Sequence, residues 1–447
     1  MLKLYNTAER KLENFKPLGE VVKIYTCGPT VYSRAHIGNL TAYIYWDLLV
    51  RVLKFNEFKI RRVLNLTDVG HLVSDGDEGE DKLEKGAKRE GKTVWEIAEF
   101  YSKDFLKNFR ALELAPPEVI AKATDYISDD MAAVSKMMEE GFVYETSDGI
   151  YFDTSRFEDY AKFARLDLSG LKAGARVSFS SEKRNAADFA VWKFIQPGEK
   201  HAMRWDYLGR PGYPGWHLEC SVIIHKELGE PIDIHAGGVD HIPIHHTNEI
   251  AQTYAMTGSS LARFWLHCNF ITIDGEKVSK SLGNTYTLDD LSSRGFSAMD
   301  FKMWVLAGHY QGTRNFTFES LAAAKARRLN WRNKIALLYQ KNNINNNNAF
   351  DRIIAAVNDN LNSPEAFSVI DTSDLTMEDW QKVDELFGLN LIADTPDVSE
   401  EIYALINERE KARAEKNYAR SDEIRDELKK QGISVEDTPS GPVWQYL

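Results

Sequence analysis

The sequence of 447 residues has few cysteines, few prolines and no long apolar run. Its 3 cysteines, Cys27, Cys220 and Cys268, are odd in number and far apart, which excludes a disulfide framework and favours a reducing compartment. With 13 prolines and 28 glycines it is neither collagen-like nor largely disordered. No segment reaches the roughly 18 apolar residues of a membrane span, and the charged N-terminus lacks the apolar core of a signal peptide. We therefore expect a globular cytoplasmic protein that does not enter a membrane.

An excess of positive charge is also missing, because 55 basic residues face 67 acidic ones and the net charge is −12. This balance excludes a protein that coats nucleic acid by bulk electrostatics, so any RNA contact has to be local. At roughly 150 residues per domain, the length predicts about three domains.

The first hundred residues alternate between strand and helix patterns. Residues 21–25 form a β-branched apolar run that ends at Cys27-Gly28-Pro29, a helical pattern starts at Leu40, and residues 60–66 predict a second strand. This is a βαβ unit, so we expect a parallel sheet with ligands at the carboxyl ends of its strands. The loop 27–39 should lie at that edge.

The alternation is interrupted between about residues 105 and 205, where a helix (126–140), a hairpin (143–152) and a loop (178–184) are predicted. It returns with 216–228, a strand at 231–235, a helix at 246–256 and a strand at 265–273. The predicted fold class is α/β: a Rossmann-like parallel-sheet catalytic domain split by an inserted domain, followed by a helical C-terminal region.

Beyond residue 306 the pattern is helical, with a last charged helix at 402–430 and an Asn-rich linker at 342–348. The acidic stretch 75–81 lacks the ligand order of an EF-hand and is interpreted as a solvated loop. The predicted domains are 1–105 (first half of the catalytic domain), 106–205 (insertion), 206–305 (second half), 306–400 (helical bundle) and 401–447 (C-terminal segment).

Two short motifs carry cations or hydrogen-bond donors suited to phosphates. His36-Ile37-Gly38-Asn39 lies where a strand gives way to a helix, so its glycine and donors can approach a phosphate; a local hydrogen-bonding turn is the alternative. Lys277-Val278-Ser279-Lys280-Ser281 follows an Asp-Gly turn and has two lysines suited to a polyphosphate, unless it is a solvated loop. Together, some 240 residues apart, they resemble the two signature motifs of class I aminoacyl-tRNA synthetases.

A third set offers metal ligands. Cys27 and Cys220 supply two thiols, and His245 and Glu249 stand four residues apart, on one face if the segment is helical. They amount to a tetrahedral zinc set. The spacing alone leaves open that the cysteines are small buried hydrophobes and His245 a cap or core residue.

Several segments in order resemble cysteinyl-tRNA synthetase. They are residues 25–32, 36–39, 65–69, 187–193, 215–221, 245–252 and 277–284, with a similar C-terminal segment at 410–444. Departures are Gly70-His71-Leu72 after Thr-Asp-Val, His241 to Ile244 before the paired histidines, and Thr247, where the family commonly has Glu. The helical region 366–400 also looks shorter than usual.

The resemblance implies ATP-dependent activation of L-cysteine to cysteinyl-adenylate and its transfer to the 3′ end of tRNA(Cys). It implies His36, Asn39, Lys277 and Lys280 as catalytic residues, with ATP bound by His36, Gly38, Asn39, Gly238 and Lys280. It further implies Thr67, Trp216 and Asp240 in the amino acid pocket, one Zn²⁺ held by Cys27, Cys220, His245 and Glu249, and Mg²⁺ bound with the ATP. Since a hydrophobic pocket discriminates by only about 1–3 kcal/mol, selection of the substrate thiolate by zinc is expected instead.

Two alternatives stay open at this point. A cysteine ligase acting on an aminosugar conjugate, as in the mycothiol pathway, would share the core without needing tRNA. A non-catalytic, zinc-stabilised RNA-binding protein would keep the fold alone. Lys325 to Lys334, with five cations in ten residues, favours tRNA because such a stretch can face phosphates; a solvated helix face is its simpler explanation.

Overall fold

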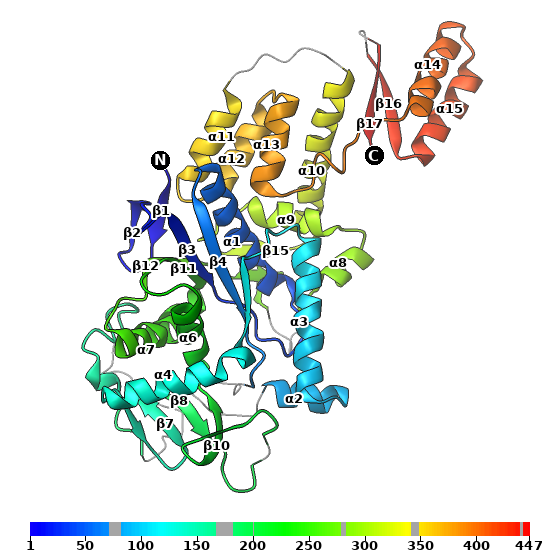
Figure 1. Ribbon diagram of the computed structural model, residues 1–447. Coiled ribbons are helices and arrows are strands. Elements are labelled where there is room, and N and C mark those ends of the chain that lie inside the picture. Colours follow the sequence, from blue (N-terminus) through cyan, green and yellow to red (C-terminus); the bar gives the residue numbers. More distant parts are fainter. Residues whose placement is uncertain (71–81, 167–181, 200, 279–282, 341–347, 439–440) are drawn as a thin grey trace.

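The computed structural model describes residues 1–70, 82–166, 182–199, 201–278, 283–340, 348–438 and 441–447 (Figure 1). The acidic loop 75–81, His71, Leu72, Lys280 and all of the Asn-rich linker except Asn348 lie outside these ranges, and so does most of the loop 178–184. Among the described residues, no helix has the length and apolar character needed to cross a bilayer.

A five-stranded parallel sheet forms the centre of the molecule, in the order β12-β11-β3-β4-β5. Its strands are β3 (Val21–Thr26), β4 (Lys59–Leu66), β5 (Val119–Lys122), β11 (Ile232–Gly238) and β12 (Ala262–Cys268). The chain builds β4 and β5 on one side of β3 and later returns to add β11 and β12 on the other. The strand order therefore reverses between β3 and β11, where ligands bind in open α/β sheets.

Alternating side chains along the strands cover both faces of this sheet. Ile24, Leu64 and Leu266 pack on the face covered by α1 (Ile37–Phe55), within the largest apolar cluster. Tyr25 and Trp265, their chain neighbours, point to the opposite face, where α6 (Leu218–Glu227) packs. A helix on each face buries both sides of the strands, as parallel sheets require.

The sequence between β5 and β11 contains a second, antiparallel sheet in the order β6-β7-β8-β10-β9. The predicted hairpin is present as β6 (Val143–Glu145) and β7 (Gly149–Phe152), and the predicted helix as α4 (Ile127–Glu139). The other strands are β8 (Phe189–Phe194), β9 (Trp205–Tyr207) and β10 (Arg210–Pro214). In Figure 1 this sheet lies below the parallel one, near α2 (Lys82–Glu90) and α3 (Val94–Ala111).

The predicted strand 265–273 is wrong as a single element. The chain leaves the parallel sheet after β12, and the amide of Asn269 donates to the carbonyl of Tyr310 at 2.8 Å. β13 (Ile271–Ile273) then joins a different sheet, paired with β14 (Glu276–Lys277) and, in parallel, with β15 (Arg314–Phe316). This small sheet carries Lys277 beside the parallel sheet.

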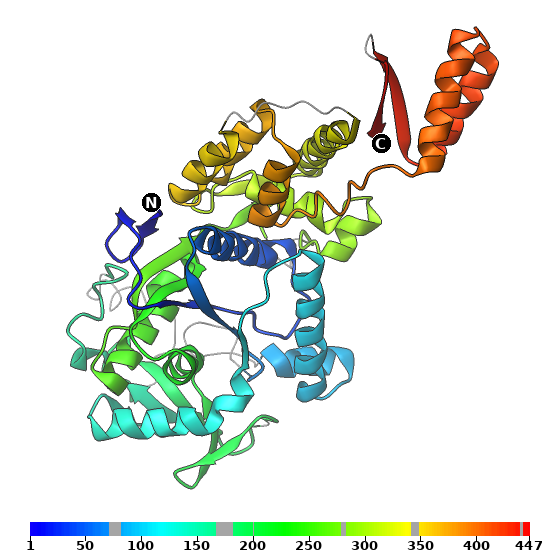
Figure 2. The same ribbon diagram turned by 45° about the horizontal axis from the view of Figure 1, so that its top comes forward.

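The rest of the chain is helical until its last hairpin. The elements are α8 (Leu288–Ser293), α9 (Ala298–Leu306), α10 (Phe318–Gln340), α11 (Ala349–Asn358), α12 (Ser363–Thr372), α13 (Met377–Phe387), α14 (Glu400–Ala414), α15 (Tyr418–Lys430), β16 (Ile433–Thr438) and β17 (Gly441–Tyr446). A short hairpin, β1 (Lys3–Asn6) and β2 (Lys11–Asn14), lies at the N-terminus. Figure 2 shows α14 to β17 standing away from the body, beyond the end of α10.

The single helix predicted at 402–430 is in fact two helices, α14 and α15. Lys416 has a φ of 62°, in the left-handed region, and Asn417 caps α15 by accepting a hydrogen bond from the amide of Arg420. The antiparallel pair β16–β17 was not predicted. Asparagine favours such a cap, so the break had a local signal in the sequence.

All five cations of Lys325 to Lys334 donate to groups of the fold, and all but the exposed Lys325 are at least half-buried. Arg327 binds Asp371, Arg328 binds Asp394 and the carbonyl of Leu389, and Arg332 binds Asp394 O and Thr395. Lys334 donates to Asp371 O at 2.6 Å and Lys325 to Gly295 O at 2.8 Å. Arg327, Arg328, Arg332 and Lys334 therefore tie α10 to its neighbours, so the stretch as a whole is not a solvated face, while Lys325 is exposed; the contact with tRNA phosphates stays a prediction.

Arg328→Ala should weaken the helical bundle. Because hydrogen bonds to charged groups contribute about 1.5–3 kcal/mol each, the free energy of local opening should fall by about 2–3 kcal/mol. Hydrogen exchange in α10 and residues 389–395 measures it, with Asn330→Ala, an exposed position on the same helix, as control. Unchanged hydrogen exchange in Arg328→Ala would contradict the conclusion that Arg328 stabilises the packing of α10.

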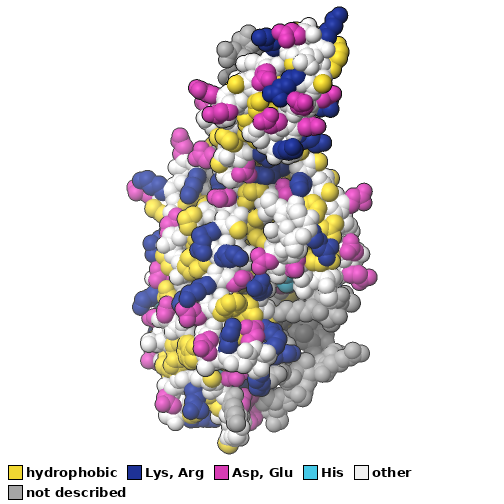
Figure 3. All heavy atoms as spheres, turned by 90° about the vertical axis from the view of Figure 1, so that its right-hand side faces the viewer, with side chains coloured by type: hydrophobic (Ala, Val, Ile, Leu, Met, Phe, Trp, Pro, Cys, Tyr) yellow, Lys and Arg dark blue, Asp and Glu magenta, His cyan; other side chains and the backbone are white. Residues whose placement is uncertain are grey.

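Figure 3 views the face at the right of Figure 1, with the C-terminal unit as its narrow upper part. Lysines, arginines and carboxylates are interspersed over this face. The described basic residues of this face therefore do not form one broad patch.

Candidate active site and metal centre

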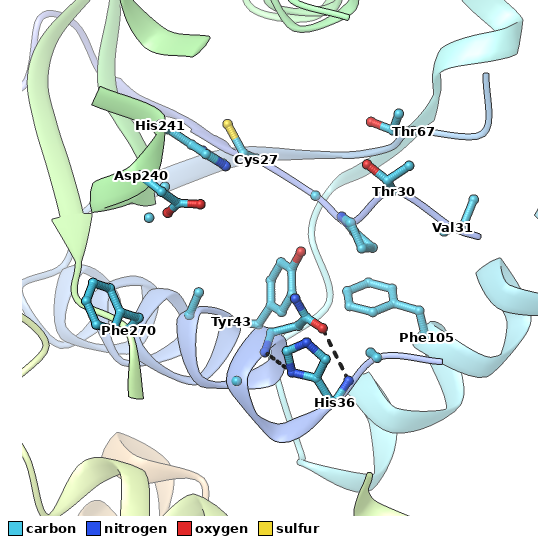
Figure 4. A pocket seen from close by; sticks show the side chains of 18 of the residues that line it. Cys27, Thr30, Val31, His36, Tyr43, Thr67, Phe105, Asp240, His241 and Phe270 are labelled. Atoms are coloured by element: carbon cyan, nitrogen blue, oxygen red, sulfur yellow. Dashed lines mark hydrogen bonds between the residues drawn. The ribbon is translucent and has the colours of Figure 1, made fainter. Parts of the chain in front are cut away.

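A cavity of about 660 Å³ opens at the carboxyl ends of β3, β4, β11 and β12. Its lining brings together eleven residues that the sequence singled out: Cys27, His36, Gly38, Asn39, Thr67, Trp216, Cys220, Gly238, Asp240, His245 and Lys277. Figure 4 shows Cys27, Asp240 and His241 on one side of this space and His36 on another, with Tyr43 between them. The volume suits a small-molecule site.

His36 caps helix α1, which therefore starts at Ile37 rather than at the predicted Leu40. Its Nδ1 accepts from the amide of Asn39 at 3.3 Å, while Asn39 Oδ1 accepts from the amide of His36 at 3.2 Å (dashed lines in Figure 4). Because Nδ1 accepts, the ring proton is assigned to Nε2. The local hydrogen-bonding alternative thus describes the turn correctly, and the same turn faces the cavity.

The two signature motifs lie next to each other. A Cβ built on Gly38 would lie 3.6 Å from the side chain of Val278, and the amide of Ile37 donates to Tyr286 O at 2.8 Å. Lys277 is exposed at the end of β14 and lines the cavity. A glycine at position 38 keeps the start of α1 open toward this loop, as close approach of a backbone to a ligand requires.

The four predicted zinc ligands converge. The ligand atoms of Cys27, Cys220, His245 and Glu249 all lie within 4.8 Å of one another, and all four residues are buried. His245 Nε2 lies 3.5 Å from Cys220 Sγ and 2.9 Å from Glu249 Oε1. Two thiols, an imidazole and a carboxylate match the ligand types of a tetrahedral zinc site, so the residues fit the ion.

Around this set lies a cluster of histidines that sequence reasoning missed. His235 Nε2 lies 2.6 Å from Glu249 Oε2, and His246 Nε2 lies 3.4 Å from Cys27 Sγ. Consequently Cys27, His235, His246 and Glu249 form a second group whose ligand atoms lie within 4.8 Å of one another. The sequence signal for His235 was a histidine next to Ile234 in a short strand that ends in Gly237-Gly238.

Further histidines contact the two rings that could bind a metal, His245 and His246. His245 Nδ1 lies 2.9 Å from His217 Nδ1, and His246 Nδ1 lies 2.8 Å from His267 Nε2. His267 continues to Thr7 Oγ1 at 2.8 Å. Hydrogen bonds on the far ring nitrogen fix tautomer and orientation in metal sites.

The protonation states at the centre depend on burial and on close charges. Burial raises the pKa of both Cys27 and Cys220. Burial alone would lower the pKa of His245, but Glu249 and Cys220 outweigh it and hold that pKa well above its usual value. A divalent cation favours thiolate and neutral imidazole, so metal binding there would release protons.

The residues expected around the amino acid differ in exposure. Thr67 is buried and hydrogen-bonded to Glu219 on α6, and Asn65 donates to Thr67 Oγ1 at 3.0 Å. The ring of Trp216 lies 4.9 Å from that of His245, while Asp240 is exposed. Glu219, which sequence reasoning missed, adds a buried carboxylate to the cavity lining.

The unusual segment before the paired histidines has a structural role. Residues 242–246 form one π-helical turn ahead of α7 (Thr247–Thr257), and Thr247 Oγ1 donates to the carbonyl of Ile242 at 2.8 Å. His241 packs its ring 5.0 Å from that of His245, and burial lowers its pKa to about 4. The Thr247 side chain therefore bonds the carbonyl of Ile242 across this turn.

Two family models match this chain, one over most of its length and one near its C-terminus. A family model described as "tRNA synthetases class I (C) catalytic domain" matches residues 14–326, and one described as "Cysteinyl-tRNA ligase anticodon binding domain" matches residues 395–444. Cysteine–tRNA ligase 1 of Burkholderia lata is 43% identical over 455 residues, which cover 98% of this chain and 96% of that protein. The cysteine–tRNA ligase of Treponema denticola is 39% identical over 490 residues, covering 100% of both chains.

Solved structures agree on the fold. Methionyl-tRNA synthetase of Mycobacterium tuberculosis, in complex with methionyl-adenylate, is similar to this chain with a TM-score of 0.57 and 13% sequence identity. The match covers 83% of this chain and 89% of that one. At this identity the likeness speaks for the shared architecture alone.

Proposed function

The chain belongs to the cysteine–tRNA ligase family of class I aminoacyl-tRNA synthetases, and from this premise we propose how its residues activate cysteine and charge tRNA(Cys). The observation that carries the proposal is the convergence, at one sheet edge, of a buried thiol–imidazole–carboxylate set with the turn of His36 and the hairpin of Lys277. Selection of a thiol and handling of a polyphosphate thus fall within one cavity. We also propose the domain limits given above and a cytoplasmic location.

In this proposal Cys27, Cys220, His245 and Glu249 hold one Zn²⁺. A zinc ion held by these four residues would supply Lewis acidity and could accept the substrate sulfur as a further ligand, which would favour a thiolate over a hydroxyl. Trp216 packs beside His245 and limits the space over the ligand set, while Thr67, oriented by Glu219, and Asp240 bind the amino acid's polar groups. Alanine has no donor atom for such a site, and serine has a poor one.

For the first reaction, the cysteine carboxylate attacks the α-phosphorus of ATP, and the bond to pyrophosphate breaks. We assign the phosphates, with their Mg²⁺, to His36 Nε2, Asn39, Lys277 and Lys280, and the adenosine side to Gly38 and Gly238. Positioned cations and donors stabilise the charge that develops in transfer. A hydroxyl of the tRNA's terminal adenosine, the 2′-hydroxyl in our proposal, then attacks the adenylate carbonyl and releases AMP.

The alternatives account for less of the chain. A ligase that acts on an aminosugar conjugate does not need an anticodon-binding domain, which residues 395–444 resemble. A non-catalytic RNA-binding function does not explain why the His36 turn and the Lys277 hairpin, both suited to phosphates, line the cavity.

ATP–pyrophosphate exchange with each of the twenty amino acids tests the proposal. We expect exchange with cysteine, and with serine a kcat/KM lower by at least about 10³, since a site built for one chemical group rejects analogues that lack it. Charging of tRNA(Cys) with cysteine should follow. Equal exchange with serine, or exchange without charging, would contradict it.

A further inference from the structure

Helix α10 joins the cavity region to the C-terminal unit (α14 to β17). It begins two residues after β15, whose partner β13 is paired with the strand that carries Lys277. Its 23 residues span about 34 Å at 1.5 Å per residue. Figures 1 and 2 both show its far end beside β17.

Near that far end, two side-chain amides of α10 form hydrogen bonds with the backbone of β17. Asn333 accepts from the amide of Tyr446 at 2.9 Å and donates to its carbonyl at 3.3 Å. Gln340, two helical turns further on, accepts from the amide of Trp444 at 2.9 Å and donates to its carbonyl at 3.0 Å. We name these four hydrogen bonds the amide clamp.

The amide clamp pairs an edge that β17 would otherwise present without a strand partner. Among the strands that the structure describes, β17 pairs with β16 alone, in a two-stranded sheet. Unpaired strand edges invite association with other chains, and here two helix side chains take the place of a neighbouring strand. The unit is thereby held by its backbone in one register and one orientation.

Apolar and aromatic contacts support the clamp, and buried cations support the helix. Trp444 packs with Ala336 in one apolar cluster, the Arg332 guanidinium lies 4.8 Å above the ring of Tyr446, and Tyr446 donates to Pro396 O at 2.6 Å. One turn earlier, Arg328 holds α10 to the loop at Leu389. The helix is therefore fixed along its length before it reaches the clamp.

We propose that α10 and the amide clamp set the span between the cavity and the C-terminal unit, which makes Asn333 and Gln340 positioning residues for tRNA charging. This rests on the proposed function, in which one tRNA reaches both places at once. Binding at one end of a rigid spacer raises the effective concentration of the other end at its own site, provided that the spacer length matches. A loosened clamp loses that gain without touching either site.

The double variant Asn333→Ala/Gln340→Ala tests the span. We expect kcat/KM for tRNA(Cys) charging to fall about tenfold and cysteine-dependent pyrophosphate exchange to stay within about twofold of the unaltered protein. The decisive substrate is a tRNA(Cys) with one added base pair in the anticodon stem. The unaltered protein should charge it about tenfold less efficiently than normal tRNA, and the double variant should narrow that gap to about twofold.

Asn330→Ala, an exposed amide on the same helix, is the matched control and should keep the discrimination. The single variants retain one amide each and should give intermediate gaps, which keeps the test valid if the double variant unfolds the hairpin. An equal loss on both tRNAs with an unchanged gap, or no loss at all, overturns the proposal. An unaltered protein that charges no tRNA with cysteine would instead contradict the proposed function.

Discussion

Cys220→Ala should lose the bound zinc and, with it, most of the preference for cysteine over serine. Cys220 is buried against His245, so the substitution removes one of two thiols from the ligand set while leaving only a small cavity. Discrimination should then fall toward the roughly 10- to 200-fold that shape and hydrophobic contact provide. Metal analysis of the purified protein and exchange assays with both amino acids measure the two effects.

Cys268→Ala is the matched control for this change. Cys268 is also buried, and burial raises the pKa of its thiol to about 12, yet it belongs to neither group of candidate ligands. This variant should keep one zinc per chain and full discrimination. If Cys220→Ala also kept both, the assignment of the metal centre would be wrong.

The second large effect is expected from Lys280→Ala. In our proposal this lysine stabilises charge that develops only while the α-phosphorus is attacked. Its loss should therefore slow adenylate formation by about 10²–10³, which corresponds to roughly 2.7–4 kcal/mol of activation free energy. The apparent affinity for cysteine should change little, because the ground state does not use the interaction. Rapid-quench measurement of adenylate formation separates the two quantities.

Lys103→Ala, an exposed lysine paired with Glu99 on α3, serves as the comparison and should leave the rate unchanged. A rate in Lys280→Ala equal to that of the control would mean that the lysine belongs to a solvated loop. The role of Lys277, on the adjoining strand β14, would then have to be tested alone.

Local sequence patterns were enough to predict most of the elements around the cavity. The run at β3 is rich in β-branched apolar residues and ends at Cys27-Gly28-Pro29, a local pattern that favours a strand. The family resemblance rested on motifs that are contiguous in sequence, and it led to the four ligands that the fold brings within 4.8 Å of one another.

The partners of the charged residues and of the histidines, in contrast, depend on long-range packing. Arg328 pairs with Asp394, which lies 66 residues later in the chain. From the local sequence alone, an arginine paired with a distant carboxylate looks the same as one that contacts phosphate or water. The second group of ligand atoms likewise depends on His235. This residue lies on β11, 14 residues before Glu249, and the fold brings its ring to the Glu249 carboxylate. The partners of buried polar groups are set by long-range packing, because desolvation forces each group to pair with whatever the fold places beside it.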